Sequence, residues 1–317
     1  MRYWLFAATI VFSTFAIVSS LVSLAVARLA PLAAERLERY SAGSRAALLF
    51  RVRLLPAVLA SIASLAIALP IFLVYEPADS DESLPLTLLA FGLAGSLLVA
   101  RGAWRAILAW HATRELRLSW QARGRRVAGF ETTLPLFAID ESFPTVAVIG
   151  VVKPALFISE RVLRECPPEE IRAMLRHEAA HVTVRDNLKR FLIRACPDLL
   201  SRGGTLDRAW AFAAEEAADA AAAADQPGTA VELAQALVRV ARLAPAAPAP
   251  ELVSAFYVGG SIESRVRHLI GAAPSVEAPA RPGLMALVSA GLCMATLVVL
   301  GASSLHQVME FVVRQLP

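Results

Sequence analysis

Long uncharged segments alternate with short charged ones along most of the chain. Uncharged runs extend over residues 3–27, 54–75, 84–100 and 284–305. At a rise of about 1.5 Å per residue, such runs can cross a hydrocarbon core of roughly 30 Å. The third run is the shortest and can continue past Arg101, whose side chain can extend to the interface. The pattern predicts a mainly α membrane protein with four transmembrane helices.

The charged residues between these runs predict the orientation. The loop at 76–83 is acidic and has no basic residue, whereas the segments at 28–53 and after residue 100 are rich in arginine. Basic loops remain on the cytoplasmic side of a membrane. We therefore expect residues 101–283 in the cytoplasm and both termini outside. Ala25-Val26-Ala27 resembles a signal-peptidase site, but cleavage there would place the arginine-rich loop outside.

The composition agrees with a membrane protein and argues against a nucleic-acid-binding protein. The chain is 57% hydrophobic and 18% charged, with a mean hydropathy of +0.57. The net charge of +4 is explained by basic cytoplasmic loops, so we expect no direct contact with nucleic acid. Cys166, Cys196 and Cys293 form no CxxC pair, which argues against a disulfide framework or a zinc knuckle. We expect these thiols to be buried and inert.

The segment between the third and fourth runs has a mixed pattern. Residues 103–122 combine three tryptophans with arginines, which favours a helix at the lipid headgroups. Short β-like runs at 145–149 and 155–158 flank a turn and predict a hairpin. Helices are expected from Pro167 through the following motif and at 186–195, 205–224, 229–243 and 261–270. The resulting domains are 1–100 with three spans, 101–283 as an α+β cytoplasmic domain, and 284–317 with the fourth span.

The run HEAAH on the first of these helices carries candidate chemistry. His177 and His181 are four residues apart, so their side chains project from one helix face and can bind one Zn²⁺. Glu178 lies beside the first ligand and can take a proton from the water that attacks a carbonyl. This order of residues is a metallopeptidase signature. The alternative is an amphipathic helix with two ordinary histidines.

A catalytic zinc also needs a third protein ligand. A third histidine six residues after His181 would indicate a metzincin, but that position is Asn187. A glutamate from a later helix is the other common solution. Glu215 and Glu216 are both candidates, and the chemistry alone does not choose between them.

HEAAHVTVRDN at 177–187 and EEAAD at 215–219 resemble the bacterial beta-lactam sensor–transducer metallopeptidases of the BlaR/MecR type. These proteins are gluzincins with a third ligand in an ExxxD motif. The resemblance implies that Glu215 is the ligand and that Asp219 and Asp186 orient the ligating imidazoles by accepting their distal N–H groups. The implied cofactor is Zn²⁺.

The resemblance also implies an inner-membrane protein with four spans and a cytoplasmic zinc domain between the third and the fourth. Its hairpin includes VVKPALFIS, where an edge strand could align a substrate peptide. SIESRVRHLIG at 261–271 resembles a downstream R-x-x-x-L stretch, which makes Arg265, and less strongly His268, a candidate for stabilising the oxyanion. The chain departs from this family in one respect: the sensor–transducers carry an extracellular penicillin-binding domain after the fourth span, whereas residues 306–317 follow the fourth run here. We therefore do not expect this chain to sense the drug itself.

These features predict a membrane-anchored zinc endopeptidase acting on cytoplasmic or membrane-proximal proteins. A regulatory role, such as cleavage of a transcriptional repressor, is the first expectation. Quality control of membrane proteins is an alternative within the same enzyme class, and a non-catalytic zinc-binding scaffold is an alternative outside it. A transporter is disfavoured because the four runs contain no charge to line a path.

Overall fold

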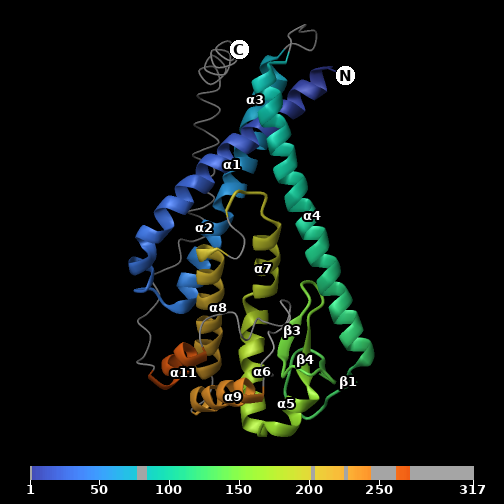
Figure 1. The fold of residues 1–317 in the computed structure, drawn as a ribbon, viewed down its shortest axis with the longest axis vertical. Coiled ribbons are helices and arrows are strands. Elements are labelled where there is room, and N and C mark those ends of the chain that lie inside the picture. The colour runs from blue at the N-terminus through green and yellow to red at the C-terminus, as the bar shows by residue number, and fades with distance from the viewer. Residues whose placement is uncertain (1, 77–83, 201–203, 225–227, 244–261, 272–317) are drawn as a thin grey trace.

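Three long apolar helices form the N-terminal part of the computed structural model (Figure 1). The structure describes residues 2–76, 84–200, 204–224, 228–243 and 262–271. The first long helix is α1 (Arg2–Leu37), and the third is α4 (Leu86–Arg123). The second consists of α2 (Ala42–Ile62), the π-helical turn η1 (Ala63–Ala68) and α3 (Leu69–Tyr75). All three are long and apolar enough to cross a membrane. The expected fourth run, 284–305, and Cys293 lie outside the described residues.

A proline explains the π-helical turn inside the second long helix. Pro70 has no N–H to donate to the carbonyl four residues before it, and its ring crowds that carbonyl. The preceding Leu69 N–H bonds to Ser64, five residues back, instead. The wider turn therefore lets the apolar helix continue through Tyr75.

The helices extend well beyond the apolar runs that predicted them. The arginine-rich segment expected as a loop at 28–53 is helical except near residues 38–41, where α1 ends and α2 has not begun. The third helix does not break at Arg101, so residues 103–122 continue along α4 instead of forming a separate helix. Trp120, expected at the lipid headgroups, is buried and stacks edge-on against Phe157.

A small mixed sheet follows α4. Its strands are β1 (Arg125–Arg126), β2 (Leu136–Ile139), β3 (Val146–Ile149) and β4 (Ala155–Ser159), arranged in the order β1-β2-β4-β3. β2 and β4 are parallel, whereas β3 and β4 are antiparallel. The expected hairpin is therefore confirmed, and β3 is an edge strand. Gly150 begins the hairpin turn at a φ of 115°, which a side chain would strain.

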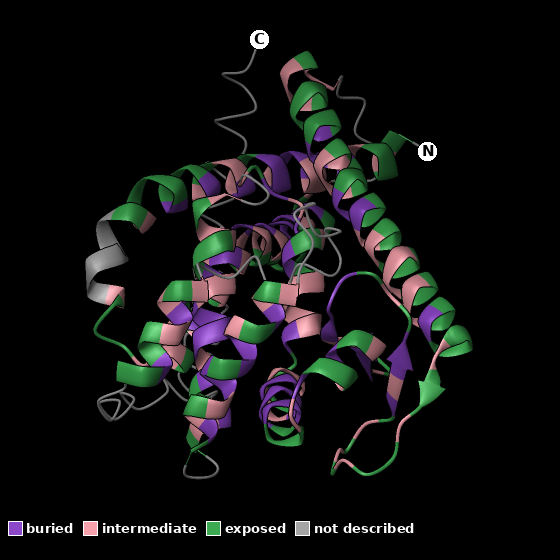
Figure 2. Cartoon of the chain, turned by 60° about the horizontal axis from the view of Figure 1, so that its bottom comes forward, coloured by how far each residue is buried: buried purple, intermediate pink, exposed green. Residues whose placement is uncertain are grey.

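Helices carry the rest of the described chain. They are α5 (Glu160–Glu165), α6 (Pro168–Thr183), α7 (Asp186–Ala195), α8 (Thr205–Ala224), α9 (Thr229–Leu243) and α11 (Ile262–Gly271). The helices predicted over these segments are confirmed, whereas α5 was not predicted. Met174 and Leu175 of α6 belong to a buried core cluster that also contains residues of the sheet and of α9. Figure 2 shows that buried and exposed residues alternate around the helices. α8 packs along α2, which joins this region to the membrane helices.

Candidate metal centre

The bend between α6 and α7 brings the motif together. Pro168 and two glutamates start α6, where a missing N–H and negative charge are both favourable. The helix ends at Thr183, and Arg185 adopts a left-handed conformation with a φ of 57°. This turn starts α7 so that Asp186, its first residue, contacts His181.

Three ligand atoms converge between α6 and α8. The Nε2 atoms of His177 and His181 lie 3.2 Å apart, and Glu215 Oε2 lies 3.3 Å from His177 Nε2. The other carboxylate oxygen of Glu215 lies 3.6 Å from His181 Nε2. Tetrahedral bonds of 2.0–2.1 Å to one ion would separate ligand atoms by about 3.3 Å. The three buried residues therefore form a group that could hold a metal ion.

The far sides of both imidazoles are occupied by carboxylates. His177 Nδ1 lies 2.8 Å from Asp219, and His181 Nδ1 lies 2.8 Å from Asp186. When both imidazoles are neutral, a ring proton on each Nδ1 suits these carboxylates and leaves each Nε2 as an acceptor. Glu215 Oε2 is buried and lies 3.4 Å from Arg265. Three acceptor atoms then converge on one space, which suits a cation.

Adjacent glutamates on α8 have different partners. Glu215 faces the histidines and also accepts a hydrogen bond from Arg190 at 3.0 Å. Glu216 bonds instead to Arg45 of the membrane helix α2. Successive residues on a helix point about 100° apart, so only one of the two can face the metal group. The structure therefore places Glu215, the residue that the family resemblance implied, in the metal group.

The electrostatics of the group follow from burial and from this pairing. Burial alone would lower the pKa of His181, but Glu215 and Asp186 outweigh it and raise the pKa to about 10. Burial alone would raise the pKa of Glu215, but the two imidazoles hold it well below its usual range. A proton can thus occupy the space that a metal ion would take.

Glu178 follows His177 on α6, and its side chain points toward the sheet. Its Oε2 atom accepts a hydrogen bond of 2.9 Å from the backbone N–H of Val148 on edge strand β3. Burial is the largest influence on Glu178 and raises its pKa, although the imidazoles and the Val148 N–H oppose this. The carboxylate is therefore fixed beside the metal group at a pKa suited to receiving a proton.

Arg265 of α11 is buried beside the metal group. Its guanidinium makes two hydrogen bonds to Asp219, at 2.8 and 2.6 Å, and lies 3.4 Å from Glu215. In this arrangement Arg265 fixes the carboxylates of Asp219 and Glu215, which in turn contact His177. Oxyanion stabilisation by Arg265 would require it to leave these partners, and that role stays a prediction. His268 on the same helix is exposed.

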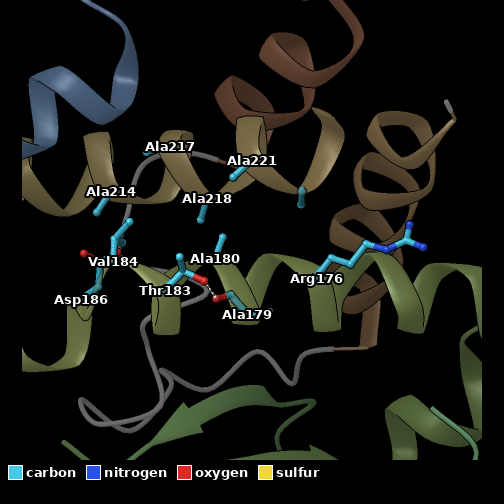
Figure 3. Close-up of a pocket in the computed structure, with 11 residues that line it drawn as sticks. Arg176, Ala179, Ala180, Thr183, Val184, Asp186, Ala214, Ala217, Ala218 and Ala221 are labelled. Atoms are coloured by element: carbon cyan, nitrogen blue, oxygen red, sulfur yellow. Dashed lines mark hydrogen bonds between the residues drawn. The ribbon is translucent and has the colours of Figure 1, made fainter. Parts of the chain in front are cut away.

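Small side chains allow α6 and α8 to approach closely. A groove of about 300 Å³ lies between them, and Figure 3 shows Ala180 and Ala218 pointing toward each other across it. The groove lies on the flank of α6 away from Glu178. The alanines leave room for the two backbones to come near, which brings Glu215 and Asp219 within reach of His177.

Sequence reasoning missed several partners of the group. Asn187 served only to exclude a third histidine, yet its side chain bonds to β3. Arg190 and Arg45 gave no signal because their partners are distant in sequence. Cys166 and Cys196 are buried and free, as expected, and burial raises their pKa to about 11 and about 12.

Comparison with known proteins does not identify a family. No protein-family model matches the chain, and a search of curated proteins found no significant match.

Proposed function

We propose that the protein is a membrane-anchored zinc endopeptidase of the gluzincin type. The observation that carries the proposal is the convergence of His177, His181 and Glu215 within 4.8 Å, with Glu178 fixed on the adjoining flank of the same helix. Two imidazoles and one carboxylate leave a fourth position open, which is the ligand set of a catalytic zinc. A purely structural zinc would be closed by a fourth protein ligand.

The roles of the residues follow from their positions. Zinc held here would supply a Lewis acid that polarises the scissile carbonyl and lowers the pKa of water. Glu178 takes one proton from the attacking water and delivers it to the amine nitrogen as the C–N bond breaks. The Val148 N–H holds one oxygen of this carboxylate and so orients it. Asp219 and Asp186 keep both Nε2 atoms directed at the ion.

We further propose the topology that the loop charges and the family resemblance favour. It has four spans, with the fourth at 284–305, and places the zinc domain on the cytoplasmic side of a bacterial inner membrane. The packing of α8 against α2 supports a site close to the bilayer. Substrates are then cytoplasmic or membrane-proximal proteins. Cleavage of a regulatory protein such as a repressor is the role that the resemblance implies, with quality control as the alternative.

A paired measurement on the full chain in detergent tests the proposal. We expect about one zinc per chain and cleavage of β-casein, used as an unfolded protein probe. Glu178→Gln should keep the zinc and lower the cleavage rate by about 10²- to 10⁴-fold, because only the proton acceptor is removed. His177→Ala should lose both zinc and cleavage. Protein without zinc, or unchanged cleavage by Glu178→Gln, would refute the proposal, and the second result would favour a non-catalytic scaffold.

A further inference from the structure

The segment at 195–200, which links α7 to α8, contacts all three apolar helices, and we call it the tip. Figure 1 shows α7 rising from the metal-binding helices toward α1, with the tip at its upper end. The Ser19 hydroxyl of α1 donates a hydrogen bond of 3.3 Å to the carbonyl of Pro197. Arg53 of α2 pairs with Asp198, and both side chains are buried. Part of the chain that carries the metal group therefore ends among the apolar helices.

The third apolar helix, α4, meets the tip at a glycine. A Cβ at Gly102 would lie 2.7 Å from the carbonyl oxygen of Ala195 and 2.9 Å from Pro197. Three turns of contact are not needed, because Arg105 on the same helix also bonds to the carbonyl of Cys196. The tip therefore lies at the level of residues 102–105 of α4.

These contacts measure how deep the tip would lie in a bilayer. Ser19 is eight residues inside the uncharged run 3–27, and Arg53 directly precedes the run 54–75. α4 begins at Leu86, so Gly102 lies about 24 Å along its axis, which is less than the roughly 30 Å of a hydrocarbon core. All three helices thus place the tip at the cytoplasmic end of the hydrocarbon and not below it.

The polar groups of the tip are paired in the way that this depth requires. Non-helical backbone at membrane depth is tolerated only where protein satisfies it. The carbonyls of Cys196 and Pro197 both accept hydrogen bonds from the apolar helices. The carboxylate of Asp198 has a cation beside it, which offsets the cost of burying its charge.

Apolar side chains are exposed on and beside the tip. Leu199 is 56% exposed and Leu192, at the same end of α7, is 38% exposed. Trp104 and Trp110 of α4 are also exposed, and tryptophan is enriched where the hydrocarbon meets the headgroups. This surface continues the exposed apolar face of α4. Lipid, rather than water, is the surrounding that suits it.

We propose that the tip inserts into the cytoplasmic leaflet of the bilayer, where Leu199 and Leu192 contact lipid. The inference requires the three apolar helices to cross a membrane, and it does not depend on peptidase activity. α7 is ten residues long, so insertion of the tip fixes Asp186, beside the metal group, about 15 Å from the end of the hydrocarbon.

Spin labels on the full chain in phosphatidylethanolamine–phosphatidylglycerol vesicles test the insertion. Leu199→Cys carries the label, and Leu192→Cys replaces it if that variant does not fold. Two exposed positions serve as matched references: Leu97→Cys on the apolar face of α4 and Val184→Cys at the end of α6. Cys293→Ala is the common parent, since Cys166 and Cys196 are buried.

Power saturation compares collisions of each label with oxygen, which enters lipid, and with a hydrated nickel complex, which does not. The oxygen-to-nickel ratio at Leu199 should match that at Leu97 and exceed that at Val184 by roughly tenfold or more, because transfer of a polar complex into hydrocarbon is unfavourable.

Other results would overturn the insertion. A ratio at Leu199 equal to that at Val184 would place the tip in water. Poor access of both reagents would show that protein covers the tip in place of lipid. An aqueous ratio at Leu97 would refute the membrane topology itself, whereas zinc binding and β-casein cleavage test the peptidase separately.

Discussion

Two buried charged clusters share helix α8, and they differ in how their charges are paired. In the metal group, two imidazole nitrogens and a Glu215 oxygen converge on one space. The second cluster lies between α2 and α8, where Arg53 bonds to Asp207 at 2.7 Å and also to Asp198. There the guanidinium fills the space between the carboxylates. Three acceptors around one space make a candidate binding site, whereas a cation paired with two carboxylates makes a brace.

The brace connects the membrane helices to the segment between α7 and α8. Arg53 lies on α2, and Arg105 of α4 bonds to the carbonyl of Cys196 in that segment. Arg45, two turns before Arg53 on α2, bonds to Glu216 of α8. α8 therefore has one side fixed to the apolar helix α2 and presents Glu215 on another. The brace holds this candidate metal ligand in place without contributing an atom to the metal group.

The largest expected effect comes from breaking the brace. Arg53→Met leaves the buried Asp198 and the half-buried Asp207 without their cation, which should lower the free energy of unfolding by about 3–5 kcal/mol. Denaturation by SDS in mixed micelles measures the change. Arg51→Met, two residues away on an exposed face, should have little effect. A triple variant that also replaces both aspartates with leucine should recover most of the loss. Equal stability of Arg53→Met and wild type would show that the cluster is no brace.

A sharper comparison uses the two neighbouring glutamates. Glu215→Gln weakens one of the metal ligands and should lower zinc affinity by roughly 10²- to 10³-fold, about a quarter of the binding free energy of a zinc site. Glu216→Gln alters only the contact with Arg45, so zinc affinity should change by no more than a few-fold. Competition with a chelator measures both. Equal losses of zinc affinity in the two variants would show that Glu215 and Glu216 do not have separate roles in metal binding and in the contact with α2.

The smallest expected effect is a pH dependence confined to the metal group. Without metal, the raised pKa of His181, about 10, keeps it protonated between pH 6 and pH 8. Zinc must displace this proton, so apparent affinity should rise as pH rises, by about tenfold per pH unit for one proton. Titration calorimetry in buffers of different ionisation enthalpy counts the proton released. Affinity independent of pH over this range would contradict the expected exchange of proton for metal.

The sequence by itself determined the parts that depend on local geometry. The four-residue spacing placed His177 and His181 on one helix face, and two short β-like runs around a turn predicted the β3–β4 hairpin. The helix at 205–224 was also predicted from its composition. Helical periodicity and turn chemistry act over a few residues, so the amino-acid sequence is sufficient to predict these elements.

Only the tertiary structure decided which distant groups meet. The residues alone left Glu215 and Glu216 equivalent, and the packing of α8 against α2 on one side and α6 on another separates them. The sequence analysis predicted a loop at 28–53 because the segment is rich in arginine. In the structure the segment is largely helical, and Arg45 and Arg53 pair with carboxylates on α8. Asn187 finds its hydrogen-bond partners in the same way, at carbonyls 37 and 39 residues earlier. Such pairings depend on how helices pack, and no local pattern encodes them.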